Sequence, residues 1–181
     1  MSGALILTGG PGSGKSSVLD ALSTLLEIEA VRFGAIESEQ LARGYPWLAP
    51  AEWIPQLAAV VALQRRMGRD TFLVVATTED EDQLRAVVTA VEAQPVIVVC
   101  LTAHPELAAE RVAAREPDSW PGKAALVDHA RVLAERIPAL PGLDLVVSTA
   151  NRAVTDVAVE IVQALRDRGI LPPHATAPAI A

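Results

Sequence analysis

Short runs of consecutive apolar residues alternate along the chain with longer segments in which apolar residues recur every three or four positions. The continuous runs predict strands that are buried on both faces, and the three-to-four spacing predicts amphipathic helices. The predicted strands are residues 4–8, 29–37, 71–76, 95–101 and 144–149. The segment 29–37 gives the weakest of these predictions, because Gly34 interrupts it.

Helical spacing is found after each predicted strand. The predicted helices are residues 15–26, 38–44, 49–68, a helix with the apolar positions Leu84, Val87, Val88 and Val91, a helix that starts at Pro105, and residues 154–165. Two local signals mark helix starts. Thr78 followed by Glu81 has the spacing of a capping box, and Pro105 suits a first helical turn, where its missing N–H costs nothing.

Strands that alternate with helices through short connections imply right-handed crossovers and a parallel sheet. We therefore expect an α/β fold of three layers, with a five-stranded parallel sheet and helices on both faces. A chain of 181 residues is long enough for one well-buried domain and short for two. We place this single domain at residues 1–171 and expect residues 172–181, which lack periodicity, to form a C-terminal tail.

The composition narrows the classes of partner. Apolar residues make up 51% of the chain and aromatic residues only 3%, so the core must consist of aliphatic side chains. The net charge of −7 disfavours a general nucleic-acid surface. Any phosphate site must then be local, formed by a few basic groups against an acidic background.

The cysteine count and the hydropathy bear on location. Cys100, within "VIVVCL", is the only cysteine, so no disulfide can form inside the chain, and we expect a core residue in a reducing compartment. No apolar run approaches 18 residues, and the N-terminus lacks a basic region. We expect a cytoplasmic protein with no membrane partner, either a monomer or a homodimer.

The stretch "LILTGGPGSGKSSV" carries the clearest chemistry. Gly9-x-x-x-x-Gly14-Lys15-Ser16 fits the P-loop pattern between a strand and a helix. Its backbone N–H groups and the helix N-terminus would hold a di- or triphosphate. Lys15 would reach the β- and γ-phosphates, and the Ser16 hydroxyl would bind Mg²⁺. The residues expected to contact nucleotide here are Gly10, Pro11, Gly12, Ser13, Gly14, Lys15, Ser16 and Ser17.

Two other nucleotide-binding classes fit less well. Lys15 stands where a dinucleotide-binding G-x-G-x-x-G motif has its last glycine. The segment after the last strand contains Asn151, Arg152, Ala153 and Val154, so it lacks the aspartate of the guanine-reading N-K-x-D signature. We expect ATP, with its base against this loop and either Arg152 or Thr149 near the ring.

Two further stretches complete a pattern. "AIESEQLARG" follows the strand at 29–37, and "LTAHPELAAERVAARE" spans residues 101–116. Together with the P-loop they resemble the small P-loop kinases: nucleoside monophosphate, shikimate, gluconate and adenylylsulfate kinases and chloramphenicol phosphotransferase. The first stretch is similar to their D-x-D or D-G-D-x-x-R motif, and the second to their L-x-A-x-x-E-x-x-x-x-R-x-x-x-R segment before the lid.

The resemblance implies roles for the first stretch. Glu39 matches the catalytic aspartate best and would accept or orient the acceptor hydroxyl, and Glu37 would contact substrate or a Mg²⁺-bound water. This requires the strand at 29–37 to run beside the first strand. Arg43 could hold an anionic group of the substrate. Alternatively, both glutamates decorate an exposed helix start.

In the second stretch, Arg111 and Arg115 lie four residues apart and share one helix face. The resemblance implies that they close over the transferring phosphoryl group. The alternative is that they pair with Glu110 or Glu116 on the surface. The segment "EPDSWPGK" would be the lid, at about residues 115–124.

One departure from the family concerns magnesium. Many P-loop kinases carry an aspartate at the end of the third strand, where this chain has Thr77 and Thr78. The acids at 79–82 fit the first turn of a helix. If none of them reaches the site, magnesium binding depends on Ser16 and the pair Glu37 and Glu39.

The acceptor pocket is expected between the end of the strand at 29–37 and the helix at 49–68. Tyr45, Trp47 and Trp53 gather there, either to contact a flat acceptor or to cap the core. We therefore expect an ATP-dependent kinase acting on a hydroxyl of a metabolite or natural product. The alternatives are a nucleoside or nucleotide kinase and a nucleotide-binding regulatory module without transferase activity.

Overall fold

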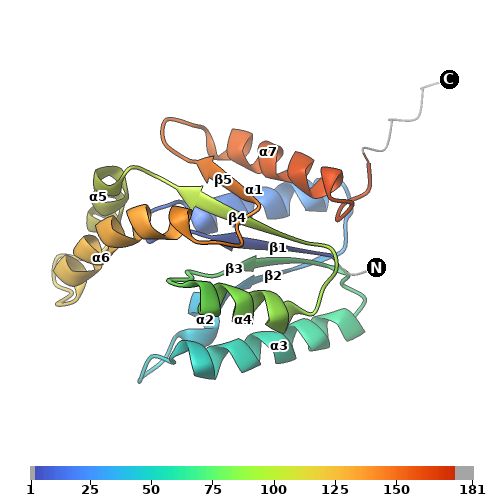
Figure 1. Cartoon of the computed structure of the whole chain (residues 1–181), viewed down its shortest axis with the longest axis horizontal. Helices are drawn as coiled ribbons and strands as arrows, with labels where there is room; N and C mark the ends of the chain where they lie inside the picture. Colours follow the sequence, from blue (N-terminus) through green and yellow to red (C-terminus); the bar gives the residue numbers. More distant parts are fainter. Residues whose placement is uncertain (1–2, 174–181) are drawn as a thin grey trace.

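The five predicted strands form one parallel sheet. A computed structural model, which describes residues 3–173, orders them β2-β3-β1-β4-β5. The strands are β1 (Gly3–Thr8), β2 (Phe33–Glu37), β3 (Thr71–Val75), β4 (Val96–Thr102) and β5 (Leu145–Ser148). Helices cover both faces (Figure 1), so the predicted fold class is confirmed. Most of the predicted tail, residues 174–181, lies outside the described residues.

The helices lie in three groups. α1 (Lys15–Ile28) and α7 (Val154–Asp167) cover one face of the sheet. The other face is covered by α2 (Ser38–Ala42), α3 (Pro50–Arg66) and α4 (Glu81–Val91). α5 (Pro105–Arg115) and α6 (Lys123–Arg136) pack together at the end of the molecule towards which the strand arrows point, and a 3-10 turn (Ile137–Ala139) follows α6 (Figure 1).

The continuous apolar runs are strands because both of their faces are covered. In β1, Leu5 and Leu7 pack among the side chains of α1 and α7, whereas Ala4 and Ile6 pack among those of α3 and α4. All four side chains are fully buried. Alternate residues of a strand point to opposite faces, so a strand between two helical layers is apolar at every position.

Cys100 lies in β4 and packs against Leu133 of α6 and Ile137. Its side chain is fully buried, and burial raises the pKa of its thiol to about 11. This confirms the prediction of a core residue and leaves no reactive thiolate at neutral pH. Among residues 3–173, no helix has both the length and the apolar character needed to cross a membrane.

The role predicted for Glu37 and Glu39 required β2 to run beside β1, but the structure does not place it there. β3 lies between them, with Phe33 paired to Thr71 and Glu37 to Val75. The exposure of the two strands agrees with this order. Every residue of β3 is buried, as in a central strand, whereas Ala35 of β2 is exposed, as on an edge strand.

Residues 123–136, to which the sequence analysis assigned no element, form α6. Only Ala130 and Leu133 of this helix are buried. Apolar residues occur on several sides of this helix, so the two buried positions do not stand out as a periodic stripe. The predicted lid segment, residues 116–123, therefore connects two helices and ends at the first residue of α6.

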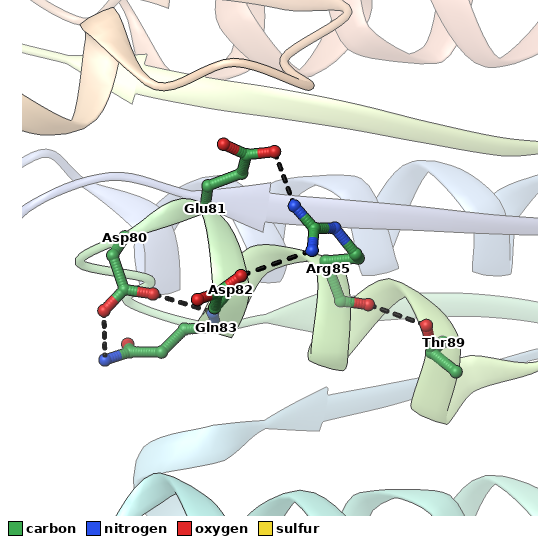
Figure 2. Close-up of polar contacts among 6 residues, drawn as sticks. All are labelled: Asp80, Glu81, Asp82, Gln83, Arg85 and Thr89. Atoms are coloured by element: carbon green, nitrogen blue, oxygen red, sulfur yellow. Dashed lines mark hydrogen bonds and ion pairs between the residues drawn. The ribbon is translucent and has the colours of Figure 1, made fainter.

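The start of α4 differs from the predicted capping box of Thr78 and Glu81. The N-cap is Asp80, whose Oδ1 accepts from the Gln83 N–H at 2.8 Å and whose Oδ2 accepts from Gln83 Nε2 at 3.2 Å (Figure 2). Thr78 instead shares a hydroxyl hydrogen bond of 2.8 Å with Thr8 at the end of β1. Thr78 is tied to the sheet, so the helix begins two residues later.

Replacing Asp80 with alanine is expected to lower the free energy of unfolding by about 1 kcal/mol, because the first turn of α4 loses its side-chain cap. Urea denaturation measures this. Asp82→Ala is the matched control, since Asp82 is almost fully exposed and only pairs with Arg85 on the helix surface. Equal losses from the two variants would show that Asp80 acts through its charge and not as a cap.

Candidate active site

The phosphate loop, residues 9–16, connects β1 to α1. Gly9 and Gly12 adopt φ values of +142° and +80°. A Cβ atom at Gly9 would overlap the backbone oxygen of Leu101, and one at Gly12 would overlap that of Ala108. Both positions therefore require glycine for its backbone conformation and for the close approach of β4 and α5. The loop is held at the centre of the sheet's carboxyl edge, where ligands bind in open α/β sheets.

Lys15 is the first residue of α1, and its side chain is buried in the loop. Its Nζ donates to the backbone oxygens of Gly9 at 2.8 Å and Gly10 at 3.0 Å. Burial lowers the pKa of Lys15 from 10.5 to about 8. Within residues 3–173 no carboxylate contacts this ammonium group directly, so a bound anion would restore the solvation that it has lost.

Charges from two other elements converge on Lys15. The carboxylate of Glu39 raises its pKa, the guanidinium of Arg115 lowers it, and Glu37 raises it more weakly. Glu37 is the last residue of β2 and is half-buried, and Glu39 lies exposed in the first turn of α2. Neither glutamate has an ion-pair partner within residues 3–173. The structure thus brings the ends of β2 and α5 to the phosphate loop although β3 separates β2 from β1.

Ser16 and Ser17 are exposed in the first turn of α1. The Ser16 hydroxyl is a hard oxygen ligand next to the phosphate cradle, which suits a Mg²⁺ ion that keeps most of its water and shares phosphate oxygens. In the described part of the chain, no three His, Cys, Asp or Glu side chains gather closely enough to hold a metal. The exposed Ser16 hydroxyl fits a Mg²⁺ ion whose other ligands are water and phosphate oxygens of a bound nucleotide.

The acids that follow β3 are occupied elsewhere. Asp80 caps α4, and Arg85 pairs with Glu81 at 2.5 Å and with Asp82 at 3.3 Å (Figure 2). Glu79 pairs with His129 of α6, with 2.9 Å between Oε1 and Nε2. Glu81 and Asp82 occupy the first turn of a helix, as expected, and none of the four acids contacts the phosphate loop. Glu37 and Glu39 are the acids whose charge reaches Lys15.

The two arginines of α5 have different surroundings. Arg111 is half-buried, and its Nη1 donates to the Gly12 oxygen at 3.1 Å and to Thr149 Oγ1 at 3.0 Å. Arg115, in the last turn, is exposed and pairs with Glu116 at 2.7 Å. The pairing with Glu116 agrees with the alternative that Arg115 forms an ion pair on the surface. The charge of Arg115 nevertheless lowers the pKa of Lys15.

The remaining predicted contacts are spread more widely. Arg43 and Trp47 are exposed in the loop after α2, beside the fully exposed Tyr45. Trp53 is only 6% exposed and packs in the core between α3 and the sheet, so we do not retain it in the acceptor site. Arg152 follows β5 and pairs with Glu160 of α7 at 2.7 Å.

The sequence did not predict two contacts near the site. Thr149 directly follows β5 and was expected near the base of ATP as the alternative to Arg152. In the structure it accepts from Arg111 Nη1 and donates to the Ser13 oxygen. His129 meets Glu79 across the carboxyl edge of the sheet. Neither lies in a local motif, because the partners are 136 and 50 residues apart. A helix predicted over residues 123–136 would have been the sequence signal that drew attention to His129, which lies on it.

The chain matches the family model AAA_33, described as an AAA domain, over residues 5–136, and it belongs to this family. A search of curated protein sequences found no significant match. The matched range includes the phosphate loop, Glu37, Glu39, Arg111 and Arg115, and it ends at the last residue of α6.

Solved structures with the same fold include several small P-loop kinases. The APS kinase of Mycobacterium tuberculosis, solved with AMPPNP and APS, matches with a TM-score of 0.64 and 17% identity over 91% of this chain and 98% of that one. The gluconokinase of Sinorhizobium meliloti matches with 0.60 and 20% over 92% of each chain. The shikimate kinase of Acinetobacter baumannii, solved with shikimate, matches with 0.58 and 18% over 94% and 97%. The resemblance to small P-loop kinases is confirmed.

Proposed function

We propose that this protein is an ATP- and Mg²⁺-dependent kinase that transfers the γ-phosphoryl group to a hydroxyl of a small metabolite or natural product. The main support is the buried Lys15 in the phosphate loop, held by the Gly9 and Gly10 oxygens. The charges of Glu39, Arg115 and Glu37 act on its pKa. Phosphoryl transfer needs cations for the phosphates and a carboxylate for the attacking hydroxyl. The loop and its surroundings provide both.

Lys15 would move from the carbonyls of Gly9 and Gly10 to the β- and γ-phosphates of ATP. Ser16 would hold Mg²⁺, which neutralises charge on the same phosphates when bound. Arg115, exposed at the end of α5 and before the proposed lid at 115–124, would turn from Glu116 to the transferring group. Each of these cations then balances charge that develops as the bond to ADP lengthens.

Glu39 would act on the acceptor. Its carboxylate accepts the proton of the acceptor hydroxyl while that oxygen forms a bond to the γ-phosphorus, and the bond between this phosphorus and the leaving oxygen of ADP breaks. Because Glu39 is exposed and lacks an ion-pair partner within the described residues, its oxygens are available for this contact. Arg43, Tyr45 and Trp47 are exposed in the loop that follows α2 and would orient an acceptor with a ring or an anionic group.

Transfer of ³²P from γ-labelled ATP with Mg²⁺ to a panel of acceptors tests the proposal, with a Lys15 variant run beside the wild type. The panel contains nucleosides, nucleotides, sugars, sugar acids and hydroxylated antibiotics. A labelled product that the variant does not form establishes the kinase and the class of its acceptor. Labelled nucleotides alone would favour a nucleoside or nucleotide kinase.

A regulatory module without transferase activity remains the second candidate. The acids at 79–82, which follow β3, favour this candidate. They cap α4 or pair with Arg85 and His129, so none of these carboxylates lies at the phosphate loop. Tight binding of Mg²⁺-ATP without transfer to any acceptor in the panel would support this candidate over the kinase.

The affinity for Mg²⁺-ATP is expected to fall as the pH rises above about 8. Lys15 loses its proton near this pH in the free protein, so at higher pH the nucleotide must bind together with a proton, and the Kd rises about tenfold per pH unit. Calorimetric titrations between pH 7 and 9.5, in two buffers of different ionisation enthalpy, measure both the Kd and the proton uptake. An affinity that is constant over this range would place the Lys15 pKa well above 8.

A further inference from the structure

A network of hydrogen bonds holds the outer side of the phosphate loop, and Thr149 is at its centre. The Thr149 Oγ1 lies 3.0 Å from the Ser13 oxygen and 3.3 Å from the Thr102 oxygen, and it accepts from Arg111 Nη1 at 3.0 Å. The Thr149 N–H donates to the Thr102 oxygen at 2.8 Å. The residue is buried, so these contacts are shielded from water.

A hydroxyl has one proton to donate and two lone pairs. Arg111 Nη1 donates to one lone pair of the Thr149 hydroxyl. The hydroxyl donates its own proton to the nearer of its two carbonyl neighbours, the Ser13 oxygen. Arg111 Nη1 also donates to the Gly12 oxygen at 3.1 Å, and Nη2 donates to the Thr149 oxygen at 3.3 Å. Two successive carbonyls of the loop, those of Gly12 and Ser13, are therefore held from outside by Arg111 and Thr149.

Holding these carbonyls sets the direction of the N–H groups on the same peptide units. In a planar trans peptide the C=O and N–H bonds point in opposite directions. The N–H paired with the Gly12 carbonyl is that of Ser13, which closes a turn on the Gly10 oxygen at 3.2 Å. The N–H paired with the Ser13 carbonyl is that of Gly14, and it has no partner among the described residues, so it remains available to a phosphate oxygen.

We propose that Thr149 and Arg111 are positioning residues of the phosphate loop. They fix the Gly12–Ser13 peptide in its turn on Gly10, and they fix the Ser13–Gly14 peptide so that the Gly14 N–H faces the nucleotide phosphates. This inference rests on the proposed nucleotide site. It also separates the two arginines of α5. Arg111 is fixed behind the loop, where Gly12 lies directly against Ala108 of the same helix, and Arg115 is the arginine that faces the transferring group.

The test measures binding of Mg²⁺-ATP and of inorganic tripolyphosphate by calorimetry. Thr149→Val keeps the shape and the branched Cβ but removes the hydroxyl, and it is expected to raise both Kd values about 5- to 30-fold, since a buried carbonyl loses its donor. Thr149→Ser keeps the hydroxyl and is expected to stay within about threefold of the wild type. Thr89→Val is the control, because the Thr89 hydroxyl only bonds to Arg85 within α4 (Figure 2).

Arg111→Lys provides the second variant. A single ammonium cannot reproduce the fork that joins Gly12 to both oxygens of Thr149, so its Kd for Mg²⁺-ATP is expected to rise about tenfold. If Thr149→Val does not fold, the Kd of Arg111→Lys for Mg²⁺-ATP tests the proposal instead. A normal nucleotide Kd with lost phosphoryl transfer in Arg111→Lys would show that Arg111 acts on the transferring group, and would overturn the proposal.

Unchanged phosphate affinity in Thr149→Val, or equal losses in Thr149→Val and Thr149→Ser, would also overturn it. Failure of this inference can be distinguished from failure of the proposed kinase function. A wild-type protein that binds Mg²⁺-ATP but transfers no phosphate would refute the kinase and still allow these affinities to be compared. A wild-type protein that binds neither Mg²⁺-ATP nor tripolyphosphate would refute both.

Discussion

Replacing Lys15 with methionine will lower kcat/KM for phosphoryl transfer by at least about 1,000-fold, because the variant loses the cation that balances charge on the β- and γ-phosphates. Methionine fills nearly the same volume, so the loop keeps its packing. The measurement is ³²P transfer from γ-labelled ATP to the acceptor found in the panel. Arg69→Met is the control, since it also removes a positive charge but at an exposed residue that precedes β3, at the edge of the sheet opposite the phosphate loop.

The same substitution is expected to stabilise the protein without nucleotide. Burial lowers the pKa of Lys15 to about 8, which corresponds to a cost on the order of 3 kcal/mol for the charged form at pH 7. The lost hydrogen bonds to Gly9 and Gly10 offset part of the gain, so we expect the free energy of unfolding to rise by on the order of 1 kcal/mol. An inactive variant that is more stable than the wild type could not owe its inactivity to misfolding.

The pH dependence of this effect has a definite sign. The pKa of Lys15 is lower in the folded chain than its ordinary 10.5, so the unfolded chain binds more protons between about pH 8 and pH 10.5. The stability of the wild type should therefore rise across this window relative to Lys15→Met. Full transfer activity in Lys15→Met would contradict the assignment of the phosphate loop.

The sheet could be predicted because its strands are defined by local composition. In β3 all five residues are buried and four consecutive ones, Phe72 to Val75, are apolar, so such a run is recognisable in isolation. Strand order is a different kind of information. The role predicted for Glu37 and Glu39 depended on β2 lying beside β1, but β3 lies between them, and the exposure of Ala35 is typical of an edge strand. Exposure of a small residue is invisible in a hydropathy pattern.

The phosphate loop could also be predicted, because a P-loop is a contiguous motif whose chemistry depends on backbone N–H groups and one lysine. The rest of the candidate site comes from four other elements. Thr149 reaches Ser13 across 136 residues, and no periodicity or short motif encodes that contact. The N-cap of α4 was misplaced for a related reason, since the hydrogen bond between Thr78 and Thr8 is a tertiary contact that delays the helix start.

Replacing Glu39 with glutamine is expected to lower kcat by about 100- to 10,000-fold while the Kd for Mg²⁺-ATP stays within about threefold of the wild type. Glutamine keeps the size of the side chain but cannot accept the proton of the acceptor hydroxyl. The measurement is transfer from γ-labelled ATP, with calorimetry for nucleotide binding. Glu27→Gln is the control, because it changes the net charge equally at an exposed position near the end of α1.

A second readout of Glu39→Gln does not depend on the acceptor. The carboxylate of Glu39 raises the pKa of Lys15 against the effect of burial, so removing its charge should lower that pKa below about 8. Because the chain has two lysines, NMR of ¹³C-labelled lysine resolves Lys15, with Lys123 as an internal reference. Full turnover with a lowered Lys15 pKa would leave Glu39 next to the phosphates but would assign the proton acceptor to Glu37. Full turnover with an unchanged pKa would remove Glu39 from the site, because a carboxylate that does not act on Lys15 cannot lie beside the phosphate that Lys15 binds.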